Sequence, residues 1–140
     1  MSQMNGPAVF RQLLNKPGFI QALGVWDPLS ARVCESMGVE CVHIGGYQAG
    51  VGTAISEPLM TLTELATLCH YVTSAVKIPV FVDAGTGFGE PLHVMRSVKE
   101  LERTGIAGMH IEDQIFPKRA HYHKYVEHTV SCEEMVDKIK

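Results

Sequence analysis

The feature that most constrains the fold is a regular alternation of short apolar runs with longer segments of helical spacing. The apolar runs cover residues 20–26, 41–45, 78–83 and 107–112. They are apolar at consecutive positions, which is typical of parallel strands covered on both faces. The sequence therefore predicts four consecutive strand–helix units. These fit either an open doubly wound sheet or about half of a (β/α)8 barrel, since a whole barrel needs about 250 residues.

The segments between the strands carry helix start and stop signals. The first helix is predicted to begin at Asp27 and Pro28 and to end at Gly38. Three further helices are predicted to begin near residues 61, 91 and 131, at two capping-box patterns and one proline. The first helix carries apolar residues at intervals of four: Leu29, Val33 and Met37.

Composition excludes several classes of protein. The 140 residues are 46% hydrophobic, which suits one ordinary globular domain. A net charge of -3 without blocks of like charge gives no basis for nucleic-acid or membrane binding. No targeting signal or membrane-length apolar run is present, so we expect a cytoplasmic protein. Without a C-x-x-C pair, the four cysteines are expected to be reduced core residues: Cys34, Cys41, Cys69 and Cys132.

Acidic residues collect where the predicted strands end. In both candidate architectures ligands bind at the carboxyl ends of the strands. Carboxylates gathered there would repel one another, and a hard divalent cation, most plausibly Mg²⁺, would relieve that repulsion. Alternatively, Asp27 and Asp113 cap helices or accept hydrogen bonds from loop amides. The strand ends deliver Trp26 and Asp27, then Gly45 and Gly46, then Asp83, and finally Glu112, Asp113 and Gln114.

The glycine-rich stretch VDAGTGFGEP after the third strand has three interpretations. Asp83 could hold a metal, the glycines could cradle a dinucleotide phosphate, or the segment could be a ligand-free turn. Its spacing is G-x-G-x-G, whereas the dinucleotide fingerprint is G-x-G-x-x-G. Asp83 would also repel a pyrophosphate, so the spacing and the charge both favour the other two interpretations.

A long connection follows the fourth strand. Residues 114–130 exceed the usual 2 to 6 residues of a βα loop, and long loops beside ligand sites often act as lids. This loop carries Lys118, Arg119, His121 and His123, which would present cations and titratable imidazoles to an anionic substrate. A solvated polar loop and a metal-binding histidine pair are the alternatives.

Four motifs together resemble a known family. They are GVWDPLSARVCESMGVE, IPVFVDAGTGFG, GIAGMHIEDQIFPKR and SCEEMVDKI. From Phe10 to Lys140 the chain resembles the amino-terminal half of the isocitrate lyase and phosphoenolpyruvate mutase superfamily. That resemblance implies that residues 1–140 are the amino-terminal half of a TIM (β/α)8 barrel, its first four βα units. It also implies a homo-oligomeric, Mg²⁺-dependent lyase that cleaves a C–C bond in a small 2-hydroxy or 2-oxo dicarboxylate through an enolate.

The resemblance also implies roles for particular residues. Asp83 and Glu112 match the metal-binding carboxylates, and Lys118 matches the basic residue of a mobile loop. Gly45 and Gly46 fall where backbone amides receive a substrate carboxylate. We further expect substrate contacts from Trp26 and Arg119, and proton transfer from His121 or His123.

The chain departs from the family pattern at several positions. Gly85 replaces the second aspartate of a D-x-D pair, and Ala120 replaces the loop cysteine that serves the lyases as acid or base. Gly45 replaces a serine, and Glu57 stands near a usual aspartate. An oxaloacetate-type decarboxylase or hydrolase, or a phosphonate P–C bond enzyme, is therefore an alternative. A third possibility is a non-catalytic half-barrel binding module.

Overall fold

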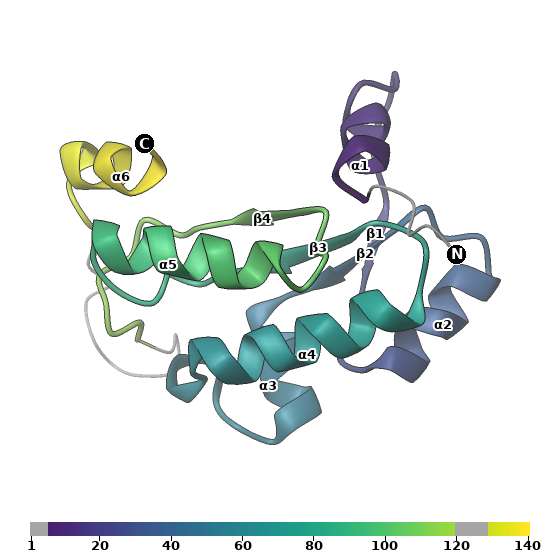
Figure 1. The fold of residues 1–140 in the computed structure, drawn as a ribbon, viewed down its shortest axis with the longest axis horizontal. Coiled ribbons are helices and arrows are strands. Elements are labelled where there is room, and N and C mark those ends of the chain that lie inside the picture. The colour runs from purple at the N-terminus through teal and green to yellow at the C-terminus, as the bar shows by residue number, and fades with distance from the viewer. Residues whose placement is uncertain (1–5, 120–128) are drawn as a thin grey trace.

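Four parallel strands form one sheet in sequence order (Figure 1). The computed structural model describes residues 6–119 and 129–140. In the sheet, β1 pairs with β2, β2 with β3, and β3 with β4, each pair parallel. This order is the one expected from consecutive βα units. The strands are β1 (Ala22–Gly24), β2 (Cys41–Ile44), β3 (Val80–Asp83) and β4 (Gly108–His110).

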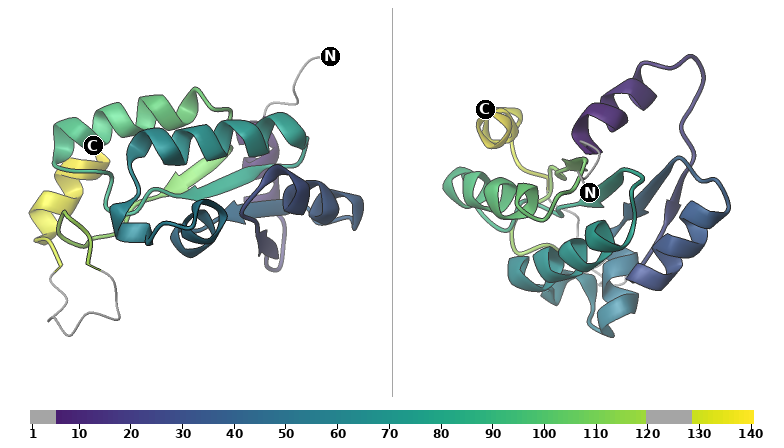
Figure 2. Two further views of the ribbon diagram at one scale, coloured as in Figure 1. Left: turned by 90° about the horizontal axis from the view of Figure 1, so that it is seen from below. Right: turned by 45° about the vertical axis from the view of Figure 1, so that its right-hand side comes forward.

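Helices flank the sheet on both sides (Figure 2). On one side α2, α4 and α5 lie next to one another, and α1 lies on the opposite side. The helices of the described residues are α1 (Gly6–Leu14), α2 (Pro28–Ser36), α3 (Gly46–Thr53), α4 (Leu62–Ala75), α5 (Pro91–Glu102) and α6 (Cys132–Ile139), with a short 3-10 helix η1 (Glu57–Leu59).

The two faces of the sheet have different chemistry. Toward α4 the strands present fully or nearly fully buried aliphatic residues, which form the core with one face of that helix. The other face carries rings, and Phe10 of α1 stacks on Phe81 with centroids 5.4 Å apart. His43 and His110 continue this ring layer toward the carboxyl ends of the strands. The ring layer therefore leads from a packed end beneath α1 to a polar rim.

The predicted helix starts are confirmed. Asp27 accepts a hydrogen bond from the Ser30 amide at 2.6 Å, so it caps α2. Thr61 and Glu64 form the reciprocal capping box of α4. Gly38 follows α2 with a φ of +82°, which glycine adopts readily. Asp27 is thus a structural residue.

Three expectations about the elements were wrong or incomplete. Neither α1 nor α3 was predicted. The apolar residues spaced four apart along α2 face outward, since Leu29 is 71% exposed and Met37 is 74% exposed. The small residues Ala31 and Cys34 form the buried face instead, and α2 contacts α4. Among the cysteines, Cys41 and Cys69 are buried as expected, but Cys132 is exposed.

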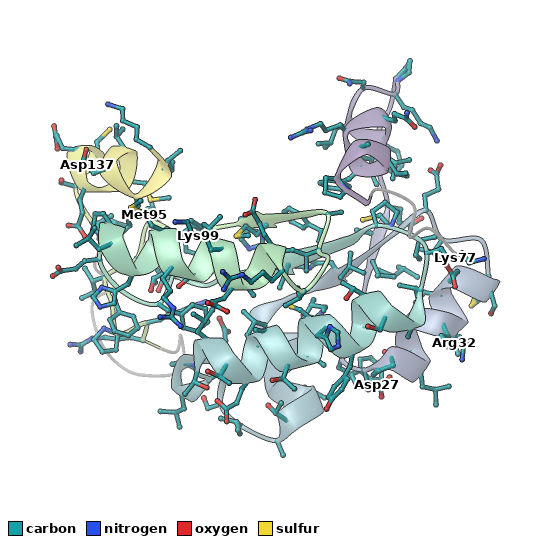
Figure 3. All side chains as sticks on the ribbon, viewed as in Figure 1. Asp27, Arg32, Lys77, Met95, Lys99 and Asp137 are labelled. Carbon is teal, nitrogen blue, oxygen red and sulfur yellow. The ribbon has the colours of Figure 1, made fainter. Side chains whose placement is uncertain are left out.

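The outer surface of the described residues is polar at many points. Charged side chains such as Arg32, Lys77 and Asp137 project into solvent (Figure 3). No helix among the described residues combines the length and apolar character needed to cross a membrane.

Candidate active site

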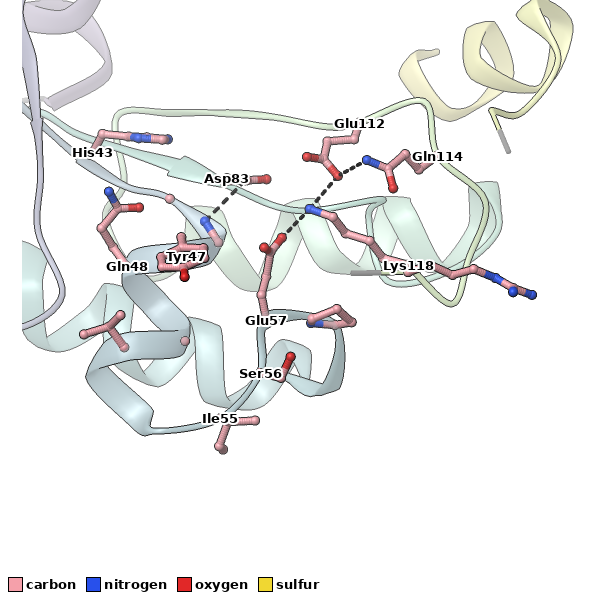
Figure 4. A pocket seen from close by; sticks show the side chains of 16 residues that line it. His43, Tyr47, Gln48, Ile55, Ser56, Glu57, Asp83, Glu112, Gln114 and Lys118 are labelled. Atoms are coloured by element: carbon pink, nitrogen blue, oxygen red, sulfur yellow. Dashed lines mark hydrogen bonds and ion pairs between the residues drawn. The ribbon is translucent and has the colours of Figure 1, made fainter. Parts of the chain in front are cut away.

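An open pocket of about 710 Å³ lies at the carboxyl ends of β2 and β3, on the rim where the ring layer ends. Its walls come from the β2–α3 junction, the residues around η1, and the segment that follows β4 (Figure 4). Acidic and basic side chains from distant parts of the sequence line it together. The charged lining residues are Glu57, Asp83, Glu112, Lys118 and Arg119.

Asp83 is fixed at the end of β3 by two backbone amides and by a contact with His110. The Gly85 amide donates to Oδ1 at 2.8 Å, and the Gly46 amide donates to Oδ2 at 3.3 Å. The His110 Nε2 atom lies 3.2 Å from Oδ1. With its side chain only 12% exposed, the carboxylate is held in one orientation at the edge of the pocket. The orientation of the Asp83 carboxylate is therefore preorganised for ligand binding.

Glu57, Asp83 and Glu112 form an acidic cluster. One ligand oxygen from each can be chosen so that all three lie within 4.8 Å of one another. Their oxygens are the hard ligands that Mg²⁺ prefers, and Mg²⁺ commonly uses one or two carboxylates while keeping several waters. The residues therefore fit a magnesium ion, with Glu57 joining the two carboxylates expected from the sequence.

Lys118 reaches into this cluster from the segment after β4. Its Nζ atom forms a close ion pair with Glu57 and lies 2.8 Å from Glu112 Oε2. Burial alone would lower the pKa of Lys118, but hydrogen bonds and charge from Glu112 and Glu57 outweigh burial and raise that pKa. Lys118 is therefore a cation at neutral pH, suited to offset negative charge.

Two histidines lie on the inner side of the cluster. The rings of His43 and His110 are 5.6 Å apart. Burial and repulsion from His110 lower the pKa of His43, although the charge of Asp83 acts in the opposite direction. The buried Nε2 atom of His43 has no hydrogen-bond partner among the described residues. A neutral imidazole therefore borders the pocket.

Comparison with known proteins places this arrangement in a family. The family model described as phosphoenolpyruvate phosphomutase matches residues 10–140. A 2-methylisocitrate lyase from Aeropyrum pernix is 42% identical over 134 residues, which cover 94% of this chain and 42% of that protein. The chain belongs to the phosphoenolpyruvate mutase/isocitrate lyase superfamily.

Solved structures agree with this membership. A phosphoenolpyruvate phosphomutase from Streptomyces platensis subsp. rosaceus matches with a TM-score of 0.90 and 32% identity, over 96% of this chain and 47% of that one. A phosphonopyruvate hydrolase in complex with oxalate and Mg²⁺ matches with a TM-score of 0.85 and 25% identity, over 97% and 46%. The chain thus spans about half the length of these superfamily members. Its four strand–helix units correspond to about half of a (β/α)8 barrel.

The structure brings most of the predicted site residues of this superfamily member to one pocket. Gly45, Gly46 and Arg119 line it together with the charged cluster. Trp26 is 45% exposed and lies against Gly52 of α3, outside the pocket lining. His121 and His123 lie outside the described residues. Their predicted roles stay predictions.

Sequence reasoning gave too little weight to Glu57 and did not select His43 or His110. Glu57 lies in η1, away from any strand, so only the path of the chain after α3 brings it to the rim. His110 could have been found from its strand register, because it pairs with Asp83 across β3 and β4. The same reasoning applies to His43, which pairs with Phe81 on the ring face.

Proposed function

We propose that the protein is a Mg²⁺-dependent lyase that cleaves a C–C bond in a small 2-hydroxy or 2-oxo dicarboxylate. The observation that carries the proposal is the convergence of Glu57, Asp83, Glu112 and Lys118 in one pocket at the strand ends. Three carboxylates suit a magnesium ion, and the adjacent ammonium suits an anionic substrate.

Known superfamily members support this choice of chemistry. The relative with 42% identity is a 2-methylisocitrate lyase, and a structural neighbour binds oxalate and Mg²⁺. We propose that this chain takes substrates of the same class. We also propose that residues 1–140 form the amino-terminal half of a barrel domain in a homo-oligomer.

For a 2-hydroxy substrate, the proposed cleavage breaks one C–C bond and transfers two protons. The substrate hydroxyl loses its proton and becomes a carbonyl as the C–C bond breaks. The bonding electron pair passes to the departing carbon as an enolate, which then takes up a proton. Mg²⁺ held by the acidic cluster would act as a Lewis acid and offset negative charge on the substrate oxygens.

The residues of the chain would divide the remaining tasks. Asp83, oriented by the Gly46 and Gly85 amides, would keep the cluster in place. Lys118 would supply a positive charge beside the departing group. We assign proton delivery to His121 or His123, because position 120 carries an alanine where the lyases have a cysteine.

Substrate binding would fall to the residues that line the β2–α3 side of the pocket. Gly45 and Gly46 begin α3, whose amino terminus favours a carboxylate. The proposal includes Arg119 as a second contact to an anionic group. Trp26, which follows β1 and lies outside this lining, is proposed as a further contact.

The missing loop cysteine favours a second candidate reaction. A decarboxylase or hydrolase acting on oxaloacetate or on a phosphonate would also use the metal and Lys118, and Ala120 would be no obstacle to it. A non-catalytic binding module is the third candidate, because the chain spans about half the length of its relatives.

One assay separates these candidates. The full-length protein with Mg²⁺ is offered 2-methylisocitrate, 2,3-dimethylmalate, oxaloacetate or phosphonopyruvate, and all products of each incubation are identified. The products then identify the reaction: pyruvate and a second carboxylic acid for the lyase, pyruvate and carbon dioxide for the decarboxylase, oxalate and acetate for hydrolysis of oxaloacetate, and pyruvate and phosphate for the phosphonate hydrolase. Release of pyruvate and a second carboxylic acid from 2-methylisocitrate or 2,3-dimethylmalate supports the proposal.

Matched variants test the role of the cluster. Asp83→Asn should lower kcat/KM at least about 100-fold, because it removes a metal-binding charge. Asp113→Asn makes the same change at an exposed neighbouring position and should leave kcat/KM within about twofold. Full activity in Asp83→Asn would refute the metal assignment. Absence of any product with every compound would favour the binding module.

A further inference from the structure

Lys118 occupies a position that a metal ion in the acidic cluster would contest. Its ammonium lies between Glu57 and Glu112, as Figure 4 shows. These are two of the three carboxylates that fit Mg²⁺, and the Lys118 side chain is only 16% exposed. The lysine is therefore a well-placed partner of the carboxylates, in contrast to a solvated surface cation.

An ammonium and a magnesium ion would compete for the negative charge of the same two carboxylates. Lys118 contacts Glu57 Oε1 and Glu112 Oε2, and the ligand oxygens of the cluster lie within 4.8 Å of one another. A divalent ion among these oxygens would lie a few ångströms from the ammonium, and like charges at such distances repel strongly. Binding of Mg²⁺ would therefore weaken the contacts of the ammonium with these carboxylates.

We propose that Lys118 is a built-in competitor of Mg²⁺, so that metal binding displaces its ammonium from Glu57 and Glu112. This inference rests on the magnesium site of the proposed function and adds an order of events to it. Metal binding releases Lys118, and only then is its charge available to an anionic substrate. The lysine thereby couples metal loading to the position of the segment that follows β4.

The backbone around Lys118 is compatible with such a movement. The side chains of Phe116 and Arg119, on either side of it, lie toward solvent, so the segment is not buried in the core. Among the described residues, the two carboxylates are the partners of the ammonium that the structure records. Breaking these two contacts therefore requires no rearrangement of the core.

The first test measures Mg²⁺ affinity by calorimetry. Lys118→Met removes the competing charge and keeps a long apolar stem, so Mg²⁺ should bind about 10-fold more tightly, because one or two charge-assisted hydrogen bonds no longer oppose it. Lys118→Arg keeps the charge and should stay within about threefold of the wild type. Unchanged or weaker binding by Lys118→Met would overturn the proposal.

A matched control accounts for the change in net charge. Lys16 pairs with Glu40 at the other end of the molecule, and Lys16→Met removes the same single charge. Its Mg²⁺ affinity should stay within about twofold of the wild type, because screening weakens distant charges. An equal gain in Lys16→Met would mean a general charge effect and would count against competition.

A second test needs no substitution and so does not depend on the folding of a variant. The rate at which acetic anhydride acetylates Lys118 is followed by mass spectrometry as Mg²⁺ is added to the wild-type protein. If Mg²⁺ displaces Lys118, its acetylation rate should rise about 10-fold, because the freed amine becomes accessible. The rise should level off over the Mg²⁺ concentrations at which calorimetry shows the site to be saturated. A rate that is flat across that range would overturn displacement.

The outcomes separate this inference from the proposed function. If neither the wild type nor Lys118→Met binds Mg²⁺, the magnesium site itself fails and the inference fails with it. If both bind Mg²⁺ equally, the site stands and only the competition is refuted. If Lys118→Met binds more tightly but no compound is cleaved, the competition stands and the lyase assignment fails.

Discussion

At the scale of single residues, the absence of one side chain makes the acidic cluster possible. A Cβ atom on Gly46 would lie 2.3 Å from the carboxylate carbon of Glu57, a distance that real Cβ atoms do not show. The Glu57 carboxylate therefore occupies the space that a side chain at position 46 would take. The neighbouring Gly45 makes room for a different side chain, that of Gln48.

This difference gives a paired prediction. Gly46→Ala should force the Glu57 carboxylate away from Asp83 and Glu112 and weaken Mg²⁺ binding about 10-fold, as loss of a supporting group typically does. Gly45→Ala should displace the flexible Gln48 side chain and leave Mg²⁺ affinity within about twofold. Calorimetry with both variants checks this. Equal losses of affinity would show that neither glycine acts through Glu57.

His43 gives a prediction about pH. Its pKa is lowered from the ordinary value of 6.5 by burial and by His110. In acid the unfolded chain therefore binds a proton more readily than the folded protein does. The contribution of neutral His43 to the free energy of unfolding is present above about pH 6.5. It is lost as the pH falls through the lowered pKa of His43.

Replacing the imidazole should remove this part of the pH dependence. His43→Phe keeps a ring beside Phe81, and its free energy of unfolding should fall less than that of the wild type between pH 7.5 and pH 5. Urea unfolding without divalent cations measures the difference. The control is His70→Phe, at an exposed position of α4, which should lose as much stability in acid as the wild type. An equal loss in both variants would contradict the assignment to His43.

How far the sequence could locate the site depended on the element that carries each residue. Asp83 and Glu112 follow neighbouring parallel strands, and the ends of such strands adjoin, so local pattern was enough. Glu57 reaches the cluster only through the course of α3 and η1, which no local pattern encodes. The contact between Lys118 and Glu57 likewise joins residues 61 positions apart.

At the scale of elements, the turn after β3 explains its own glycines. Strand β3 ends at Asp83, and Gly85 and Gly87 follow with φ of +54° and +84°. The Gly87 amide donates to the Ala84 carbonyl at 3.0 Å, and the Gly87 carbonyl accepts from Ser97. The turn thus satisfies its own backbone groups and aims Asp83 at the pocket. This favours the metal and turn interpretations over a dinucleotide cradle.

Residue 85 therefore does not continue the strand. Side chains at positions 83 and 85 project to the same side only on an extended backbone, and the left-handed conformation of Gly85 departs from it. The Gly85 amide binds Asp83 from this turn. In this chain position 85 serves the site through its backbone.

The two glycines should respond differently to alanine. Gly85→Ala meets open space and should cost about 1 kcal/mol for the positive φ alone. Gly87→Ala would also place its Cβ 2.6 Å from Val94 of α5, so about 2 to 4 kcal/mol is expected. The free energy of unfolding in urea gives both values. Equal costs would mean that α5 shifts to accept the methyl group.

Element prediction failed where tertiary contacts override local propensity. Helix α3 contains three glycines, which the sequence alone does not favour in a helix. A Cβ on Gly50 would lie 2.8 Å from the Ile55 carbonyl, and one on Gly52 would lie 2.4 Å from the Trp26 carbonyl. Only glycine lets α3 pack this closely, so the residues that hide the helix from a sequence pattern are the ones its packing requires.

At the scale of the whole molecule, the sheet has two open edges, one at β1 and one at β4. Strands β1 and β4 each pair on one side only among the described residues. Two of the three residues of β1 are exposed, and Phe19 just before it is 92% exposed. In a closed barrel every strand has two neighbours, so these edges and apolar side chains are surfaces that further strands or helices could cover.

We therefore expect residues 1–140, expressed alone, to self-associate. Unpaired strand edges and exposed apolar side chains favour contacts between copies, so sedimentation velocity should detect species larger than 15.4 kDa as concentration rises. Ala22→Lys places a charge on the β1 edge and should shift the population toward monomer. Ser74→Lys adds the same charge on α4, away from the edge, and should not. A wild-type monomer at every concentration would show that the exposed edges do not drive association.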